Sequence, residues 1–261
     1  MLRAVALDVD GTVVRGDELL PGAAEGMAAV ADAGLDRLFV TNNPTRKPAA
    51  YVEKLERAGL TASAEEIVTA ATSTVAYLEA EYPGATVAVV GEDAVTERLR
   101  DGGVDAADVT AASEPAVGVV GIDRAFDYER LTAALRTLDG IPWIGTDPDA
   151  VIPAAEGDVP GSGAMVRAVA GVLERDPEAV LGKPSATTRR LVLDRLGVAP
   201  EECLVVGDRL DTDIAMGAAA GMKTALVETG VAGGRSGAER EPDYVLDSLA
   251  GLKSVLAAEG V

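Results

Sequence analysis

The chain has 261 residues, of which 48% are hydrophobic and only 3% aromatic, so aliphatic side chains must build the core of one large domain or two modest ones. Acidic residues number 43 against 23 basic ones, which gives a formal net charge of -20 at pH 7. Such a charge would repel nucleic-acid phosphates and anionic membrane surfaces, so we expect neither nucleic acid nor membrane as a partner.

The acidic residues are spread along the whole chain, and arginine greatly outnumbers lysine. This pattern resembles halophilic proteins, in which salt screens the repulsion between surface acids; an ordinary acidic protein is the alternative. No cationic leader precedes the first apolar run, and no apolar run is long enough to span a bilayer, so we expect a cytoplasmic protein. The single cysteine, Cys203, cannot form an internal disulfide.

The first predicted strand, residues 4–7, runs directly into Asp8-Val9-Asp10-Gly11-Thr12. Neighbouring residues of an extended chain point to opposite faces, so Asp8 and Asp10 are expected on one side, where they could share a metal ion or act as nucleophile and acid. Gly11 lets the backbone turn tightly around a ligand. The alternative is an acidic turn without chemistry, because Asp and Gly are common turn residues.

Helices and strands then alternate to the end of the chain, which predicts an α/β fold with a parallel sheet. Ser63 and Glu66 have the spacing of a capping box. Further strands are expected at residues 38–40, 68, 86–90, 117–122, 143–144, 204–206, 224–227 and 244–246, and helices at residues 23–33, 48–58, 72–81, 93–100, 128–138, 164–173, 186–196, 214–220 and 249–257.

Polar clusters recur where strands end. Thr41-Asn42-Asn43 follows one strand, Gly182-Lys183-Pro184-Ser185 precedes a helix, and Asp208 to Asp213 follows the strand at 204–206. The carboxyl ends of parallel strands are where open α/β sheets bind ligands. Each cluster also has a structural explanation as a cap, a solvated cation or a turn, and Asp211 is expected to be a helix N-cap.

In this order and spacing, the four clusters resemble the motifs of the haloacid dehalogenase-like hydrolase superfamily. Residues 41–46, 182–185 and 206–214 are closer still to its class IIA branch, the NagD-like or para-nitrophenylphosphatase-like phosphatases. The resemblance implies a Rossmann-like core with a parallel sheet at residues 1–82 and 178–261. It also implies an inserted α/β cap domain, of the type found in class IIA, at residues 83–177, through which members of the branch often form homodimers.

The resemblance implies a phosphatase in which Asp8 is the nucleophile and forms an aspartyl-phosphate. Asp10 would donate a proton to the leaving oxygen and later take one from water, while Thr41 and Lys183 would complete the catalytic set. A carboxylate nucleophile agrees with a chain that contains no histidine.

Mg²⁺ is the implied cofactor, because oxygen ligands favour a hard dication. By the same resemblance its ligands are Asp8, the backbone carbonyl of Asp10, and Asp208, and Asp213 would orient Lys183 or a metal-bound water. The residues expected around the phosphate are Val9, Asp10, Gly11, Thr41, Asn42 and Lys183.

Specificity is expected in the cap, because caps of this family exclude water and contact the leaving group. Arg124, Asp147 and Asp149 are candidate contacts, with a surface ion pair as the alternative for Arg124 and Asp149; relatives commonly carry Asn where this chain has Asp147. The implied substrate is a small phosphorylated metabolite, such as a sugar phosphate, a nucleotide or an aryl phosphate. A narrow phosphoglycolate or nucleotide phosphatase, a phosphomutase, and a phosphate-binding regulatory protein without turnover are the alternatives.

Overall fold

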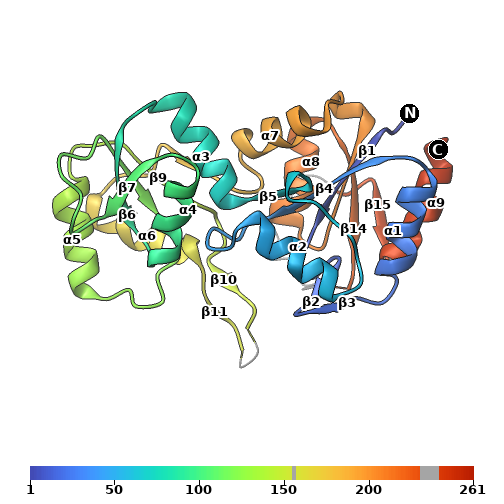
Figure 1. The fold of residues 1–261 in the computed structure, drawn as a ribbon, viewed down its shortest axis with the longest axis horizontal. Helices are drawn as coiled ribbons and strands as arrows, with labels where there is room; N and C mark the ends of the chain where they lie inside the picture. The colour runs from blue at the N-terminus through green and yellow to red at the C-terminus, as the bar shows by residue number, and fades with distance from the viewer. Residues whose placement is uncertain (155–156, 230–240) are drawn as a thin grey trace. The chain divides into compact units, whose positions relative to one another are not determined.

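The computed structural model describes residues 1–154, 157–229 and 241–261, and the chain divides into two compact units (Figure 1). The predicted cap, residues 83–177, lies within the second of them. The first unit comprises Met1–Thr41, Pro48–Val68 and Thr188–Val261, and the second comprises Asn42–Lys47 and Thr69–Thr187.

A six-stranded sheet forms the first unit, and β1 lies in it between β13 and β4, parallel to both. Strands β4 and β5, which follow β1 in the chain, lie on one side of it, and the later strands β13, β14 and β15 lie on the other. The strand order therefore reverses between β1 and β13. Ligands of open α/β sheets bind at such a switch point. Across the sheet the strands are β15 (Tyr244–Leu246), β14 (Lys223–Val227), β13 (Cys203–Gly207), β1 (Ala4–Asp8), β4 (Asp36–Thr41) and β5 (Ile67–Thr69).

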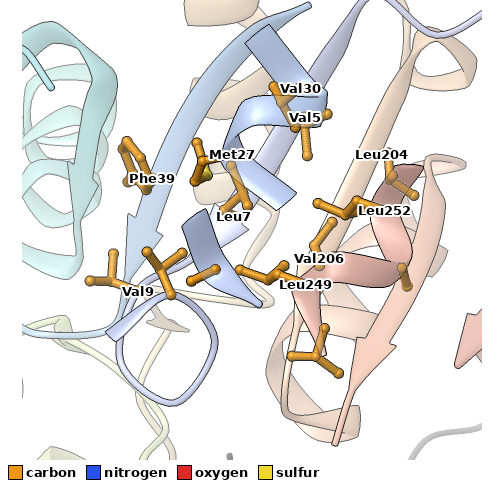
Figure 2. Packing of buried hydrophobic residues seen from close by; sticks show 14 of the residues in the cluster. Val5, Leu7, Val9, Met27, Val30, Phe39, Leu204, Val206, Leu249 and Leu252 are labelled. Carbon is orange, nitrogen blue, oxygen red and sulfur yellow. The ribbon is translucent and has the colours of Figure 1, made fainter. Parts of the chain in front are cut away.

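Alternate residues of β1 enter two different hydrophobic cores, as expected for a strand buried on both faces. Val5 and Leu7 pack with α1 and α9 on one face (Figure 2), whereas Ala4 and Ala6 pack with α7 and α8 on the other. The sheet is thus covered on both sides, which confirms the Rossmann-like core. The helices concerned are α1 (Ala23–Asp32), α2 (Pro48–Arg57), α7 (Ala186–Leu196), α8 (Ala215–Ala220) and α9 (Leu252–Ala258).

The second unit repeats this construction on a five-stranded parallel sheet. Val87 and Val89 of β6 enter one core with α3 and α4, and Ala88 and Val90 enter another with α5 and α6. Its strands, in order across the sheet, are β12 (Ala179–Val180), β9 (Trp143–Gly145), β8 (Val117–Val120), β6 (Thr86–Val90) and β7 (Asp105–Asp108). Its helices are α3 (Ala70–Glu81), α4 (Asp93–Asp101), α5 (Tyr128–Leu138) and α6 (Ser162–Leu173).

The predicted helices and strands are confirmed, with ends that differ by a few residues. The capping box is also confirmed, because Ser63 N donates to Glu66 Oε2 at 2.7 Å. Sequence analysis did not predict β7, because its two aspartates interrupt any apolar pattern. It also did not predict the strands of two residues, which are too short to show a period. Those short strands are β2 (Val14–Arg15), β3 (Glu18–Leu19), β10 (Val151–Ile152), β11 (Val159–Pro160) and β12.

Within the described ranges, no helix combines the length and the apolar character needed to cross a lipid bilayer.

Candidate active site

Three carboxylates meet at the switch point of the first sheet. Asp8 is the last residue of β1, Asp208 directly follows β13, and Asp213 lies in the turn that follows. Each offers an oxygen, and these oxygens all lie within 4.8 Å of one another. The predicted convergence of the first and last polar clusters is therefore present in the structure.

Two glycines allow these carboxylates to approach the backbone so closely. A Cβ atom at Gly11, which has a φ of +97°, would lie 2.6 Å from Asp208 Oδ2. A Cβ atom at Gly207 would overlap the carboxylate of Asp213. Any larger residue at either position would displace an acid of the cluster.

The turn after β13 is a π-helix, Leu210–Ile214, which leads into α8. Arg209 precedes this turn, and its backbone N–H donates to Asp213 Oδ2 at 3.2 Å. Asp211 lies inside the turn and accepts from the Arg209 guanidinium at 3.0 and 2.9 Å. The predicted N-cap role of Asp211 is therefore wrong, because the helical turn begins one residue earlier and the carboxylate pairs with arginine instead.

The donor set of this cluster fits a hard divalent cation. Asp208 and Asp213 are buried and Asp8 is nearly so, and like charges at this separation disfavour one another in the ionised state. An oxygen-ligated cation balances such a group, and carboxylate oxygens are the ligands that Mg²⁺ prefers. Asp213, expected only as a supporting group, lies as close to the other two as a ligand would.

Asp10 lies beyond the end of β1, and its backbone bridges to Val14 in a tight loop. The side chain is 50% exposed, and its Oδ1 forms an ion pair with Lys54 Nζ of α2. Sequence analysis missed Lys54. A signal was present, because this lysine lies between Tyr51 and Leu55, which α2 buries in the core.

Thr41 is the last residue of β4 and is buried. Its Oγ1 lies 3.3 Å from the hydroxyl of Tyr51, within hydrogen-bond distance. Helix α2 therefore contacts two of the predicted catalytic residues, Thr41 through Tyr51 and Asp10 through Lys54.

In the second unit, the Asn42 amide binds the backbone of Lys183 at two points. Lys183 N donates to Asn42 Oδ1 at 2.6 Å, and Asn42 Nδ2 donates to Lys183 O at 3.2 Å. Gly182 before it has a φ of +67°, and a Cβ atom there would lie 2.6 Å from the same amide oxygen. Two predicted site residues that are 141 positions apart are thus locked together.

The predicted cap residues have distinct surroundings. Burial raises the pKa of Asp147 to about 7, and the nearby Asp149 carboxylate adds to the increase. Thr146 Oγ1 and Asp149 N donate to the Asp147 carboxylate at 3.0 and 3.2 Å. Arg124 pairs with Glu92 at 2.6 Å and has a side chain that is 62% exposed.

Comparisons with known proteins agree on one family. Residues 5–105 match a profile described as haloacid dehalogenase-like hydrolase, and residues 180–256 match a related HAD-like profile. The chain is 35% identical over 230 residues to an acid sugar phosphatase of Staphylococcus epidermidis, covering 88% of this chain and 87% of that one. It is 34% identical over 263 residues to the sugar-phosphatase AraL of Bacillus subtilis, covering 98% and 94%.

Solved structures agree with the sequence comparisons. A p-nitrophenyl phosphatase from Archaeoglobus fulgidus superposes with a TM-score of 0.88 at 35% identity, over 97% of this chain and 99% of that one. NagD from E. coli superposes with a TM-score of 0.82 at 28% identity, over 96% and 98%. The similarity thus extends over both units.

Proposed function

Because the chain belongs to the haloacid dehalogenase-like hydrolases, in the NagD-like branch of phosphatases, we propose that it hydrolyses small phosphomonoesters through an aspartyl-phosphate at Asp8. Sugar phosphates are the proposed natural class, since similar proteins are named sugar phosphatases, and an aryl phosphate is a suitable laboratory substrate. The cytoplasmic location expected from the sequence stays a prediction.

The observation that carries this proposal is the position of Asp8 beside Asp208 and Asp213 at the switch point of the sheet. In the first step, a carboxylate oxygen of Asp8 forms a bond to phosphorus while the bond between phosphorus and the ester oxygen breaks. Asp10 gives its proton to that leaving oxygen, which departs as an alcohol. An ionised carboxylate needs no partner base for this attack, as suits a chain without histidine.

In the second step, Asp10 takes a proton from a water molecule that attacks the aspartyl-phosphate. Inorganic phosphate leaves, and Asp8 returns to its carboxylate form. The half-exposed side chain of Asp10 suits a group that exchanges protons with substrate and water in turn.

We propose that Asp8, Asp208 and the backbone carbonyl of Asp10 hold Mg²⁺, with Asp213 as a further ligand or as the group that orients a bound water. The ion supplies positive charge that offsets the repulsion between the carboxylates and the phosphate. Thr41, Asn42 and Lys183 are proposed to bind the phosphoryl oxygens, together with Val9 and Gly11. The two-point contact of Asn42 with Lys183 supports that grouping, because it fixes two of these residues to each other.

Residues 83–177 are proposed as the cap that selects the substrate, with Arg124, Asp147 and Asp149 as candidate contacts. Of the three, Asp147 has the most distinctive means of recognising a substrate. A buried carboxyl with a pKa of about 7 can donate a hydrogen bond near neutral pH.

A substrate panel tests the proposal. Purified protein with Mg²⁺ should release phosphate from p-nitrophenyl phosphate and from hexose phosphates, lose this activity in excess chelator, and regain it when Mg²⁺ is restored. In the Asp10→Asn variant, the aspartyl-phosphate should persist long enough for mass spectrometry to find one added phosphoryl group on the peptide that contains Asp8. Selective hydrolysis of phosphoglycolate or nucleotides would favour the narrow alternatives, and phosphate binding without release from any ester would favour a binding protein.

A further inference from the structure

Helix α2 carries a lysine in an unusual environment. The Lys54 side chain is only 6% exposed, and its Nζ lies 5.9 Å from the centre of the Tyr51 ring and in contact with Asp10 Oδ1. Lysine is almost never fully buried unless it is paired, because removing an ammonium group from water is costly. Asp10 is therefore the partner that makes this position tolerable for a cation.

The helix itself fixes where the lysine lies. Tyr51 and Leu55 of α2 enter the same hydrophobic core as β1, and Lys54 follows Tyr51 by three positions, on the same side of the helix. The Tyr51 hydroxyl in turn reaches Thr41. A rigid, core-anchored element thus supports two residues at the ends of β1 and β4.

The two partners of the Lys54–Asp10 pair differ in their exposure to solvent, and this distinguishes the pair from ordinary surface ion pairs. Lys47 and Asp101 form a pair in which both side chains are about half exposed, and such pairs hold neither partner firmly. In the Lys54–Asp10 pair the cation is buried while the carboxylate is 50% exposed. The lysine therefore restrains an acid that could otherwise rotate toward solvent.

We propose that Lys54 is a positioning residue that holds the Asp10 carboxyl in reach of the leaving-group oxygen. The inference rests on the proposed function, in which Asp10 gives its proton to that oxygen as the bond from phosphorus to oxygen breaks. The proton transfer leaves a carboxylate on Asp10, and the buried ammonium of Lys54 lies beside this new charge.

Leaving groups of different basicity separate positioning from general structural support. The p-nitrophenolate anion departs without a proton, whereas the alkoxide of a sugar phosphate needs one. The quantity kcat/KM reports the steps up to the first irreversible one, which is formation of the aspartyl-phosphate, so it senses the acid role of Asp10 and not its later role as a base.

The test compares kcat/KM for p-nitrophenyl phosphate and for a hexose 6-phosphate in Lys54→Met. We expect the hexose phosphate value to fall about 30-fold or more, toward the roughly 10²- to 10⁴-fold contribution of a general acid, and the aryl phosphate value to fall less than about threefold. Asp10→Asn should show the same selectivity, and Lys54→Met added to Asp10→Asn should not increase it further.

Arg57→Met is the matched control. Arg57 lies on the same helix and pairs with Asp17 at 3.2 Å, but its side chain is 55% exposed, so the ratio of the two kcat/KM values should stay at that of the wild type. Equal losses on both substrates in Lys54→Met would overturn the proposal.

Folding is checked by circular dichroism, and Lys54→Gln, which keeps a hydrogen-bond donor, repeats the measurement if Lys54→Met does not fold. Loss of folding in both variants, with Lys54→Arg folded, would assign Lys54 to stability alone and overturn the positioning role. Failure of the proposed function looks different, since the wild type would then hydrolyse neither ester.

Discussion

The two units share one architecture, yet the acids at their strand ends have different neighbours. In the second unit, Asp108 ends β7 and Asp123 follows β8, and both pair with the guanidinium of Arg130 at 2.6 and 2.9 Å. In the first unit, one oxygen from each of the carboxylates Asp8, Asp208 and Asp213 lies within 4.8 Å of the others. An acid at the end of a parallel strand therefore does not by itself mark a site.

Charge balance explains the difference. A buried carboxylate is stable when a well-placed cation and hydrogen bonds replace water. Arg130 supplies both to Asp123, because its Nε donates to Asp123 Oδ2 at 2.9 Å, and a further bond to the Gly91 carbonyl at 2.6 Å holds the guanidinium in place. Three converging carboxylates repel one another, and a bound cation would relieve this repulsion. The same sheet edge thus serves stability in the second unit, whereas ligand binding is proposed for it in the first.

The largest expected effect comes from neutralising one acid of the first unit. Asp8→Asn should lower phosphatase turnover by roughly 10³-fold or more, because an amide cannot act as the nucleophile. The variant should remain folded, since the change removes one of three neighbouring negative charges. Steady-state kinetics measure the turnover, and a thermal melt shows whether the variant is folded.

Asp123→Asn is the matched control in the second unit, because Asp123 is also a buried acid that follows a strand. It should lower the melting temperature and leave kcat per folded molecule within about threefold of the wild type. Activity of Asp8→Asn within about tenfold of the wild type would contradict the assigned nucleophile, and a comparable loss in Asp123→Asn would erase the contrast between the units.

The strand ends could be predicted from the sequence because each signal is local. An apolar run followed by Asp8 and Gly11 identifies the end of a buried strand, and four such clusters in one order identify the family. The turn after β13 was less predictable. Asp211 was misassigned because a π-helix that begins at Leu210 places it inside the turn and not before it.

The cationic partners could not be predicted, because tertiary packing brings them in. Lys54 lies 44 positions from Asp10, and Arg130 reaches acids that precede its own helix. Nothing in a run of charges says which acids will meet a buried arginine or lysine and which will meet other acids. The adaptation to salt inferred from the net charge of -20 likewise stays a prediction.

Removing the shared cation of the second unit gives the next largest effect. The Arg130 side chain is only 19% exposed. Arg130→Met removes the cationic partner of Asp108 and Asp123, and this should lower the free energy of unfolding by about 3 kcal/mol. Urea unfolding followed by circular dichroism measures this loss. A change below about 0.5 kcal/mol would mean that the acids of the second unit are stabilised by solvent and not by Arg130.

Asp147 sharpens the comparison, because this buried acid of the second unit has another acid, Asp149, beside it. The carboxyl ionises near pH 4 in the unfolded chain and at about 7 in the folded one. The folded state therefore binds the extra proton between these values, so stability falls as the pH rises through that window and the loss is complete above it.

Asp147→Asn cannot ionise and should escape this loss. The decrease in the free energy of unfolding between pH 5 and pH 8 should be smaller in the variant than in the wild type by roughly 2 kcal/mol. Urea titrations at both pH values measure it, with Asp139→Asn, at an exposed acid after α5, as the control. Equal pH dependence in wild type and Asp147→Asn would show that the Asp147 carboxyl is ionised in the folded protein at pH 5.

The smallest effect is expected at Arg124, the exposed counterpart of Arg130 in the same unit. The Arg124 side chain in its pair with Glu92 is 62% exposed. An exposed pair contributes little after solvent screening and side-chain entropy, so Arg124→Met should change the free energy of unfolding by less than about 0.5 kcal/mol.

The same variant decides between the two roles considered for Arg124. A surface ion pair leaves KM for a hexose phosphate unchanged, whereas an increase of about tenfold with an unaltered melting temperature would assign the guanidinium to substrate binding. In that case the second unit would use its exposed arginine for the substrate and its buried one for the fold.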